Sequence, residues 1–128
     1  MKTIVVVTAD PKIARALSEL VGSVLREVCD GPARVLCGCS AEDIRYILQD
    51  QPIDLLMIDY LLADIRSLDV ARWLGSGLDR TAKIILTNNG QVAAEPWNYI
   101  GSEISEVLSR PLGRESLKQA LRRYLTKN

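Results

Sequence analysis

The feature that most constrains this chain is an alternation between short apolar runs and longer stretches with helical spacing. The continuous apolar runs at 4–7 and 55–58 are typical of strands that are buried on both faces of a sheet. Further strands are predicted over 34–39, 83–87 and, more weakly, 106–108. Between these runs, apolar residues recur at three- and four-residue steps, which indicates amphipathic helices. Five strands alternating with helices predict an α/β fold, an open parallel sheet covered on both faces.

Helix boundaries are marked by capping residues. Asp10 is a good N-cap, and Pro11 suits the first helical position, so a long helix is expected to begin there and to continue to about Val28. Ser40 followed by Asp43 resembles a capping box with aspartate in place of glutamate. The remaining helices are expected over 67–76, from about Pro96, and after Gly113.

Length and composition limit the class of protein. A chain of 128 residues with 48% hydrophobic and 25% charged residues is expected to form one globular domain spanning 1–128. It contains no histidine, which removes Ser-His-Asp and Cys-His catalysis and histidine-ligated metals. The N-terminal apolar run of four residues is too short for a signal peptide or a membrane span. We therefore expect a cytoplasmic protein that is not an enzyme and does not bind a membrane.

The three cysteines are Cys29, Cys37 and Cys39. An odd number without a secretory signal favours free thiols. Cys37 and Cys39 form a C-x-C pattern, which differs from the C-x-x-C of redox sites, and no histidine is present to complete a zinc site. We expect all three to act as small apolar residues in or beside a strand.

Net charge is zero, but basic residues gather near the C-terminus. Against Glu115, this segment carries Arg110, Arg114, Lys118, Arg122, Arg123 and Lys127. A basic final helix is consistent with a solvated face, favoured by the helix dipole, or with docking to an acidic partner. Direct binding of nucleic acid is not expected, because one short basic stripe without a recognised motif is a poor footprint.

In a doubly wound sheet, ligands gather at the carboxyl ends of the strands. An aspartate that ends an apolar strand needs a partner, so Asp59 is the first residue to explain. The chain has no G-x-G-x-x-G after the first strand and no P-loop motif, and the loop after that strand has no glycine to approach a flavin phosphate. The residues at or just after the strand ends are Thr8, Ala9, Asp10, Asp59, Thr87 and Arg110.

The run 54–59, Thr87 at the end of the fourth strand and Arg110-Pro111 before the last helix together resemble the receiver domain (CheY-like) of bacterial two-component response regulators. The resemblance covers essentially the whole chain. It implies a flavodoxin-like three-layer α/β/α fold with strand order 2-1-3-4-5. It also implies that Asp59 stands at the phosphoacceptor position, that Thr87 carries the hydroxyl that follows the phosphoryl group, and that Arg110 replaces the usual lysine.

The chain also departs from this family. The acidic pair that holds Mg²⁺ in the family falls on Thr8 and Ala9, neither of which is a carboxylate. Asp10 lies one place further and is expected to cap the first helix, with at most weak Mg²⁺ binding together with Asp59. Arg110 and Thr87 are expected to neutralise Asp59 without metal, and Val107 stands at the position of the family's switching aromatic.

The resemblance leaves two interpretations. The favoured one is a degenerate receiver, or pseudo-receiver, of a two-component phosphorelay that acts through protein–protein interaction and needs no cofactor. The alternative is a working receiver that a sensor histidine kinase phosphorylates on Asp59 with Mg²⁺. A flavodoxin-like domain that binds a small molecule is a remote third.

The resemblance also implies that partners bind the face of the fourth helix, fifth strand and final helix. A sensor kinase, an output domain or a second copy of the chain would bind there. On this face we place Arg114, Lys118 and Arg122, which recur every four residues. Trp97 and Tyr99 are either part of the same face or core residues.

Overall fold

The computed structural model describes residues 1–8, 10–59, 81–87, 105–109 and 112–125. Its helices and strands are β1 (Lys2–Val7), α1 (Pro11–Val28), β2 (Ala33–Gly38), α2 (Ala41–Asp50), β3 (Leu55–Asp59), β4 (Ala82–Thr87), β5 (Glu106–Ser109) and α5 (Arg114–Leu125). The helices predicted over 67–76 and from Pro96 lie outside the described residues.

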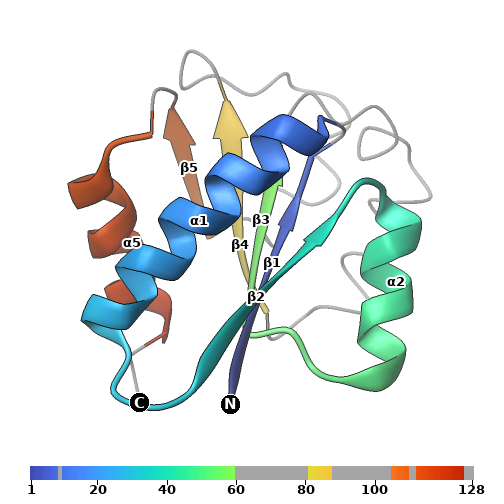
Figure 1. Ribbon diagram of the computed structural model, residues 1–128, viewed down its shortest axis with the longest axis horizontal. Helices are drawn as coiled ribbons and strands as arrows, with labels where there is room; N and C mark the ends of the chain where they lie inside the picture. The colour runs from blue at the N-terminus through green and yellow to red at the C-terminus, as the bar shows by residue number, and fades with distance from the viewer. Residues whose placement is uncertain (9, 60–80, 88–104, 110–111, 126–128) are drawn as a thin grey trace.

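The five strands form one parallel sheet in the order β2-β1-β3-β4-β5, which confirms the predicted fold class and strand order (Figure 1). The central pairings are in close register, because Val7 lies opposite both Gly38 and Ile58. Asp59 lies opposite Leu86 in β4, one residue before that strand ends. The carboxyl ends of β1, β3 and β4 therefore meet at one edge of the sheet.

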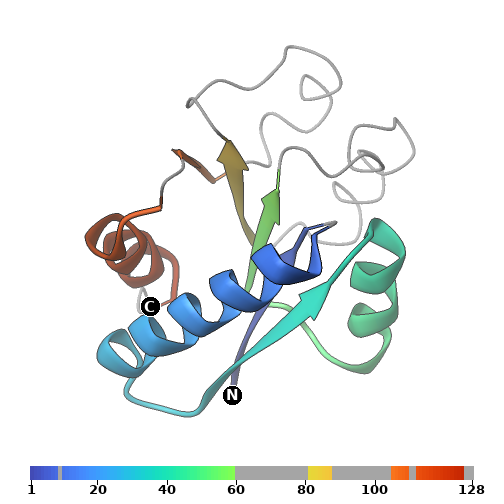
Figure 2. The ribbon, with the colours of Figure 1, turned by 45° about the horizontal axis from the view of Figure 1, so that its top comes forward.

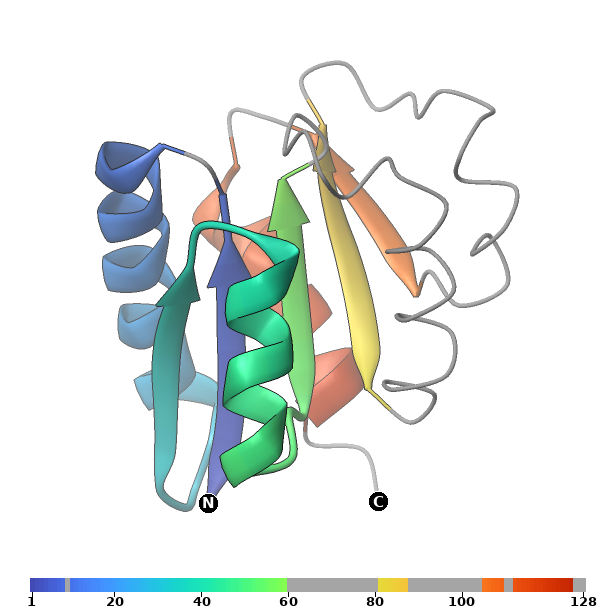
Figure 3. The ribbon, with the colours of Figure 1, turned by 90° about the vertical axis from the view of Figure 1, so that its right-hand side faces the viewer.

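Helices cover the two faces of the sheet. Figure 3 shows α1 and α5 on one face and α2 on the other. Ile4 and Val6 belong to the core that α1 and α5 cover, and the alternate residues Val5 and Val7 are buried as well. Burial on both faces explains why β1 and β3 are continuous apolar runs rather than alternating ones.

The predicted caps are confirmed. The carboxylate of Asp10 accepts a hydrogen bond from the backbone N–H of Lys12 at 2.9 Å, and Pro11 is the first residue of α1. At the start of α2, the hydroxyl of Ser40 accepts from the N–H of Asp43 at 3.3 Å. The carboxylate of Asp43 reaches one residue beyond the usual capping box and accepts from the N–H of Cys39 at 2.7 Å.

The cysteines are free thiols, as expected, and Cys37 in β2 and Cys39 directly after β2 lie in or beside a strand, as predicted. Cys29 caps the C-terminus of α1 and is not part of a strand. Cys37 and Cys39 are exposed, and the Cys37 thiol lies 2.6 Å from the hydroxyl of Ser18 in α1. β2 is an edge strand of the sheet, so the apolar side chains of Cys37 and Cys39 remain exposed there.

Among the helices of the described residues, none combines the length and the apolar character that crossing a membrane requires.

Candidate functional site

The candidate site is the carboxyl edge of the sheet, which Figure 2 brings toward the viewer. β1 ends next to Thr8, β3 ends with Asp59, and β4 ends with Thr87. The backbone of Thr87 pairs with Ser109 at the end of β5, and Arg110 is the next residue in the sequence. Ala9 and Arg110 themselves lie outside the described residues.

A hydrogen bond between Thr8 and Asp59 is the central contact of the site. The Thr8 hydroxyl donates to Oδ2 of Asp59 at 2.9 Å, across the β1–β3 pair. Both side chains are buried, since Thr8 is 1% exposed and Asp59 is 4% exposed. A buried carboxylate is stable only when hydrogen bonds or charges replace its lost hydration. Thr8 is one of the partners that stabilise Asp59.

Thr8 is held in this orientation by its backbone and by its neighbour. Its N–H donates to the carbonyl of Gly38 in β2 at 3.1 Å, which extends the β1–β2 ladder by one bond. The Thr8 hydroxyl oxygen also accepts from the N–H of Asp10 at 3.4 Å. The hydroxyl therefore accepts one hydrogen bond and donates another, to Asp59.

The carboxylate of Asp10 is engaged elsewhere. It caps α1 through the N–H of Lys12, and the side chain is exposed. Within the ranges that the structure describes, no group of three or more histidine, cysteine, aspartate or glutamate side chains could hold a metal ion. Mg²⁺ in proteins is held mainly by carboxylates, and the neutral Thr8 hydroxyl occupies a place where the resemblance led us to look for one. The described side chains at this edge do not fit a Mg²⁺ site.

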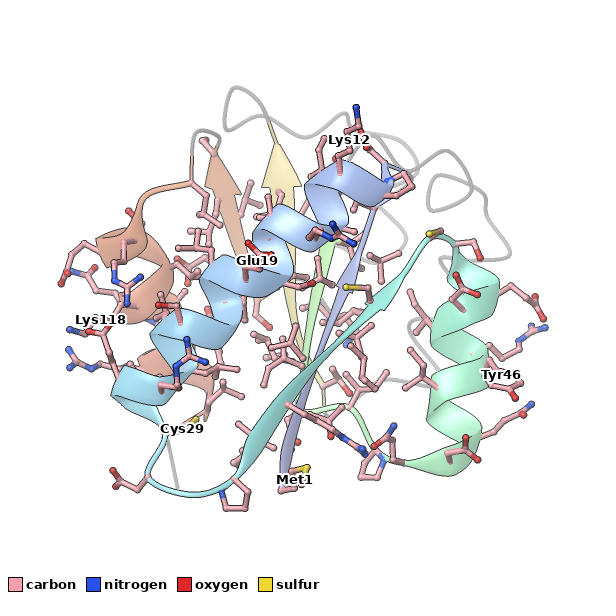
Figure 4. The ribbon with its side chains drawn as sticks, viewed as in Figure 1. Met1, Lys12, Glu19, Cys29, Tyr46 and Lys118 are labelled. Carbon is pink, nitrogen blue, oxygen red and sulfur yellow. The ribbon has the colours of Figure 1, made fainter. Side chains whose placement is uncertain are left out.

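The predicted basic stripe lies beside α1. Arg114 of α5 donates to the hydroxyl of Ser23 at 3.0 Å and forms an ion pair with Glu27, and Lys118 lies 3.3 Å from the same Glu27 carboxylate. Figure 4 shows Lys118 on the flank of α5 next to α1. Hydrogen bonds from Arg114 and then Lys118 lower the pKa of Glu27 below its ordinary value. This placement differs from the expected grouping of Arg114 and Lys118 with β5.

The contact between α5 and β5 uses residues that the sequence analysis did not place on the predicted partner face. Arg123 forms an ion pair with Glu106, and the hydroxyl of Tyr124 donates to the carbonyl of Ser105 at 2.8 Å and to Glu106 at 3.1 Å. Arg122, the third member of the predicted stripe, is exposed. Trp97 and Tyr99, predicted for the same face, lie outside the described residues.

The sequence analysis named Thr8 but not its hydrogen bond to Asp59, and it missed the buried Lys83. The Thr8 contact could have been found from register, because parallel neighbours in a doubly wound sheet place the end of the first strand beside the end of the third. Lys83 in β4 is almost fully buried, and its ammonium group donates to the carbonyl of Thr81 at 3.1 Å. A lysine inside an apolar run was the signal for such a residue.

Solved structures with the same architecture include several receiver domains. A response regulator receiver domain protein from Clostridium thermocellum superposes with a TM-score of 0.77 at 19% identity, over 98% of this chain and 95% of its own. A sensor protein from Polaromonas sp. JS666 gives a TM-score of 0.77 at 20% identity, over 98% and 96%. A receiver domain (CheY-like) from Methylobacillus flagellatus gives 0.76 at 14% identity, over 97% and 98%. These likenesses establish a CheY-like flavodoxin fold.

No protein-family model matches the sequence, and no curated protein sequence matches it.

Proposed function

We propose that this chain is a receiver-like signalling domain of a two-component system that acts by binding proteins and has lost Mg²⁺-dependent phosphorylation of Asp59. The observation that carries the proposal is the hydrogen bond from the Thr8 hydroxyl to the Asp59 carboxylate. The CheY-like fold supports a role in two-component signalling. The residues at the carboxyl edge support the loss of phosphorylation.

Charge is the physical reason for the loss. Phosphorylating an aspartate brings a phosphoryl group with several anionic oxygens onto a carboxylate, and positioned cations must neutralise the charge that develops. Thr8 is neutral, Ala9 has no ligand atom, and Asp10 caps α1. Thr8 therefore stabilises the unmodified Asp59 without supplying an anionic ligand for a metal ion.

Partner proteins are the proposed route of output. A sensor kinase or an output domain would bind the face around β5, where Val107 is 36% exposed although it is apolar. β5 ends the sheet, and the edge of a sheet presents unpaired backbone groups that can bind another chain. Trp97 and Tyr99 belong to this proposal as predicted members of the same face.

A working receiver is the second candidate, because Asp59 is in the right place for one. It ends β3 between the ends of β1 and β4, at the edge where doubly wound folds bind ligands. In this alternative, Asp59 accepts a phosphoryl group from a sensor histidine kinase.

Calorimetric titration with MgCl₂ tests the proposal. We expect no saturable binding at millimolar Mg²⁺ by the wild-type chain. The double variant Thr8→Asp with Ala9→Asp restores two carboxylates after β1, so we expect it to bind Mg²⁺ in that range.

Asp59→Asn in the double-variant background is the matched control, and it should weaken the restored binding. Saturable Mg²⁺ binding by the wild-type chain that Asp59→Asn removes would overturn the proposal in favour of a working receiver.

A further inference from the structure

One exposed side of α1 carries charges of both signs. Arg15, Glu19, Gly22 and Arg26 follow each other at steps of three and four residues, which places them on one side of a helix. The three charged members are exposed. In Figure 4, Glu19 lies on the side of α1 that faces the viewer, away from the sheet.

These charges are not used inside the described part of the chain. The flank of α1 next to α5 is engaged, because Ser23 and Glu27 bind Arg114. In contrast, neither Glu19 nor Arg26 has an ion pair or a side-chain hydrogen bond with any residue that the structure describes. The two charges remain available for a partner.

A groove runs along the same side of α1, toward the edge strand β2. It has a volume of about 660 Å³. Its lining is mostly small or apolar and includes Ser18, Gly22, Leu25, Cys29, Ala33 and Val35, with Glu19 and Arg26 also at its wall. The groove exists partly because Gly22 has no side chain, and a Cβ added there would meet no atom within 4 Å.

Packing among the residues that the structure describes does not explain Gly22. Glycine is among the poorest helix formers, yet it stands in the middle of an 18-residue helix where an alanine would meet no obstacle. A glycine is required where another backbone approaches closely. The approaching backbone would have to come from outside the described fold.

We propose that a second copy of this chain packs its α1 antiparallel to the first, with a two-fold axis passing between Gly22 and Ser23. Positions 19 and 26 are equally far from this axis, so Glu19 of each copy faces Arg26 of the other. A two-fold interface must be self-complementary, and this order of charges satisfies that requirement.

The partner is therefore a second copy rather than an unrelated acidic or basic protein, because only a surface with both signs matches Glu19 and Arg26 together. The glycines lie at the crossing point, where two helices approach most closely. This interface is separate from the β5 face, and it does not depend on the chemistry of Asp59.

Sedimentation equilibrium over a concentration series up to about 1 mM tests the proposal. We expect the wild-type chain to approach twice its mass of 14.2 kDa, and to dissociate as salt is raised because the pairs are exposed. Arg26→Glu should weaken self-association at least tenfold, since it places two carboxylates opposite each other in both symmetrical pairs. Glu19→Arg should do the same.

The charge-swapped variant, Glu19→Arg with Arg26→Glu, should recover self-association because it restores both pairs in reverse. Lys12→Glu makes the same change in net charge on the first turn of α1 and should leave association unchanged. Circular dichroism of each variant separates loss of association from loss of folding. A wild-type chain that stays monomeric throughout, or a dimer that Val107→Lys abolishes and Arg26→Glu does not, would overturn the proposal.

Discussion

At the carboxyl edge of the sheet, the Thr8 hydroxyl accepts from the N–H of Asp10 and donates to the carboxylate of Asp59. Each of these contacts is local in space, but the donor and the acceptor of the second lie 51 residues apart in sequence. The buried aspartate thus depends on a hydroxyl that the β1–β3 register brings beside it. Thr8 therefore contributes to the stability of the fold as well as to the chemistry of the candidate site.

Replacing Thr8 by valine keeps the shape of the side chain and removes the hydroxyl. Because a buried carboxylate loses a hydrogen bond, we expect Thr8→Val to lower the free energy of unfolding by about 1–3 kcal/mol. Denaturant unfolding measures the change, and Thr8→Ser, which keeps the hydroxyl, should cost clearly less. In a double-mutant cycle with Asp59→Asn, the two changes should be non-additive. A Thr8→Val chain as stable as the wild type would show that the hydroxyl does not stabilise Asp59.

At the scale of the elements, ion pairs from Glu27 of α1 to Arg114 and Lys118 hold α1 against α5. This carboxylate lies between Arg114 and Lys118 and is 39% exposed. Charge reversal at Arg114 would therefore disturb the contact between the two helices as well as any partner surface on α5. A variant of the exposed Val107 is a cleaner test of partner binding.

The α1–α5 contact should depend on pH. The pKa of Glu27 is lowered in the folded chain, so the contact stabilises the fold above the ordinary glutamate pKa of 4.5 and loses this contribution as pH falls through the lowered value. We expect thermal unfolding to show a smaller fall in Tm between neutral and acid pH for Glu27→Gln than for the wild type. Because the pairs are partly exposed, raising the salt concentration should reduce the difference. Identical pH profiles for the two chains would contradict this role of Glu27.

At the scale of the whole molecule, much of the fold could be predicted from the sequence. The continuous apolar runs of β1 and β3 are readable because both faces of the central strands are buried. The helix caps at Asp10 and Ser40 could be predicted because each joins residues only two or three positions apart in the sequence. The strand order came with the family resemblance, and the sheet confirms it.

The candidate site was predicted only in part, because its contacts join distant segments. The position of Asp59 followed from the end of an apolar run, but the hydroxyl that binds it follows from the β1–β3 register. The pairing of Arg114 with Glu27 depends on how α1 and α5 pack, which helical spacing does not reveal. The predicted roles of Thr87 and Arg110 toward Asp59 stay predictions.

Intact-mass spectrometry after incubation with Mg²⁺ and a small-molecule phosphodonor tests the central claim most directly. The wild-type chain should keep its unmodified mass, and the Thr8→Asp with Ala9→Asp variant should gain the mass of one phosphoryl group. Asp59→Asn in that variant should abolish the gain. A single phosphoryl adduct on the wild-type chain that Asp59→Asn removes would contradict the account and establish a working receiver.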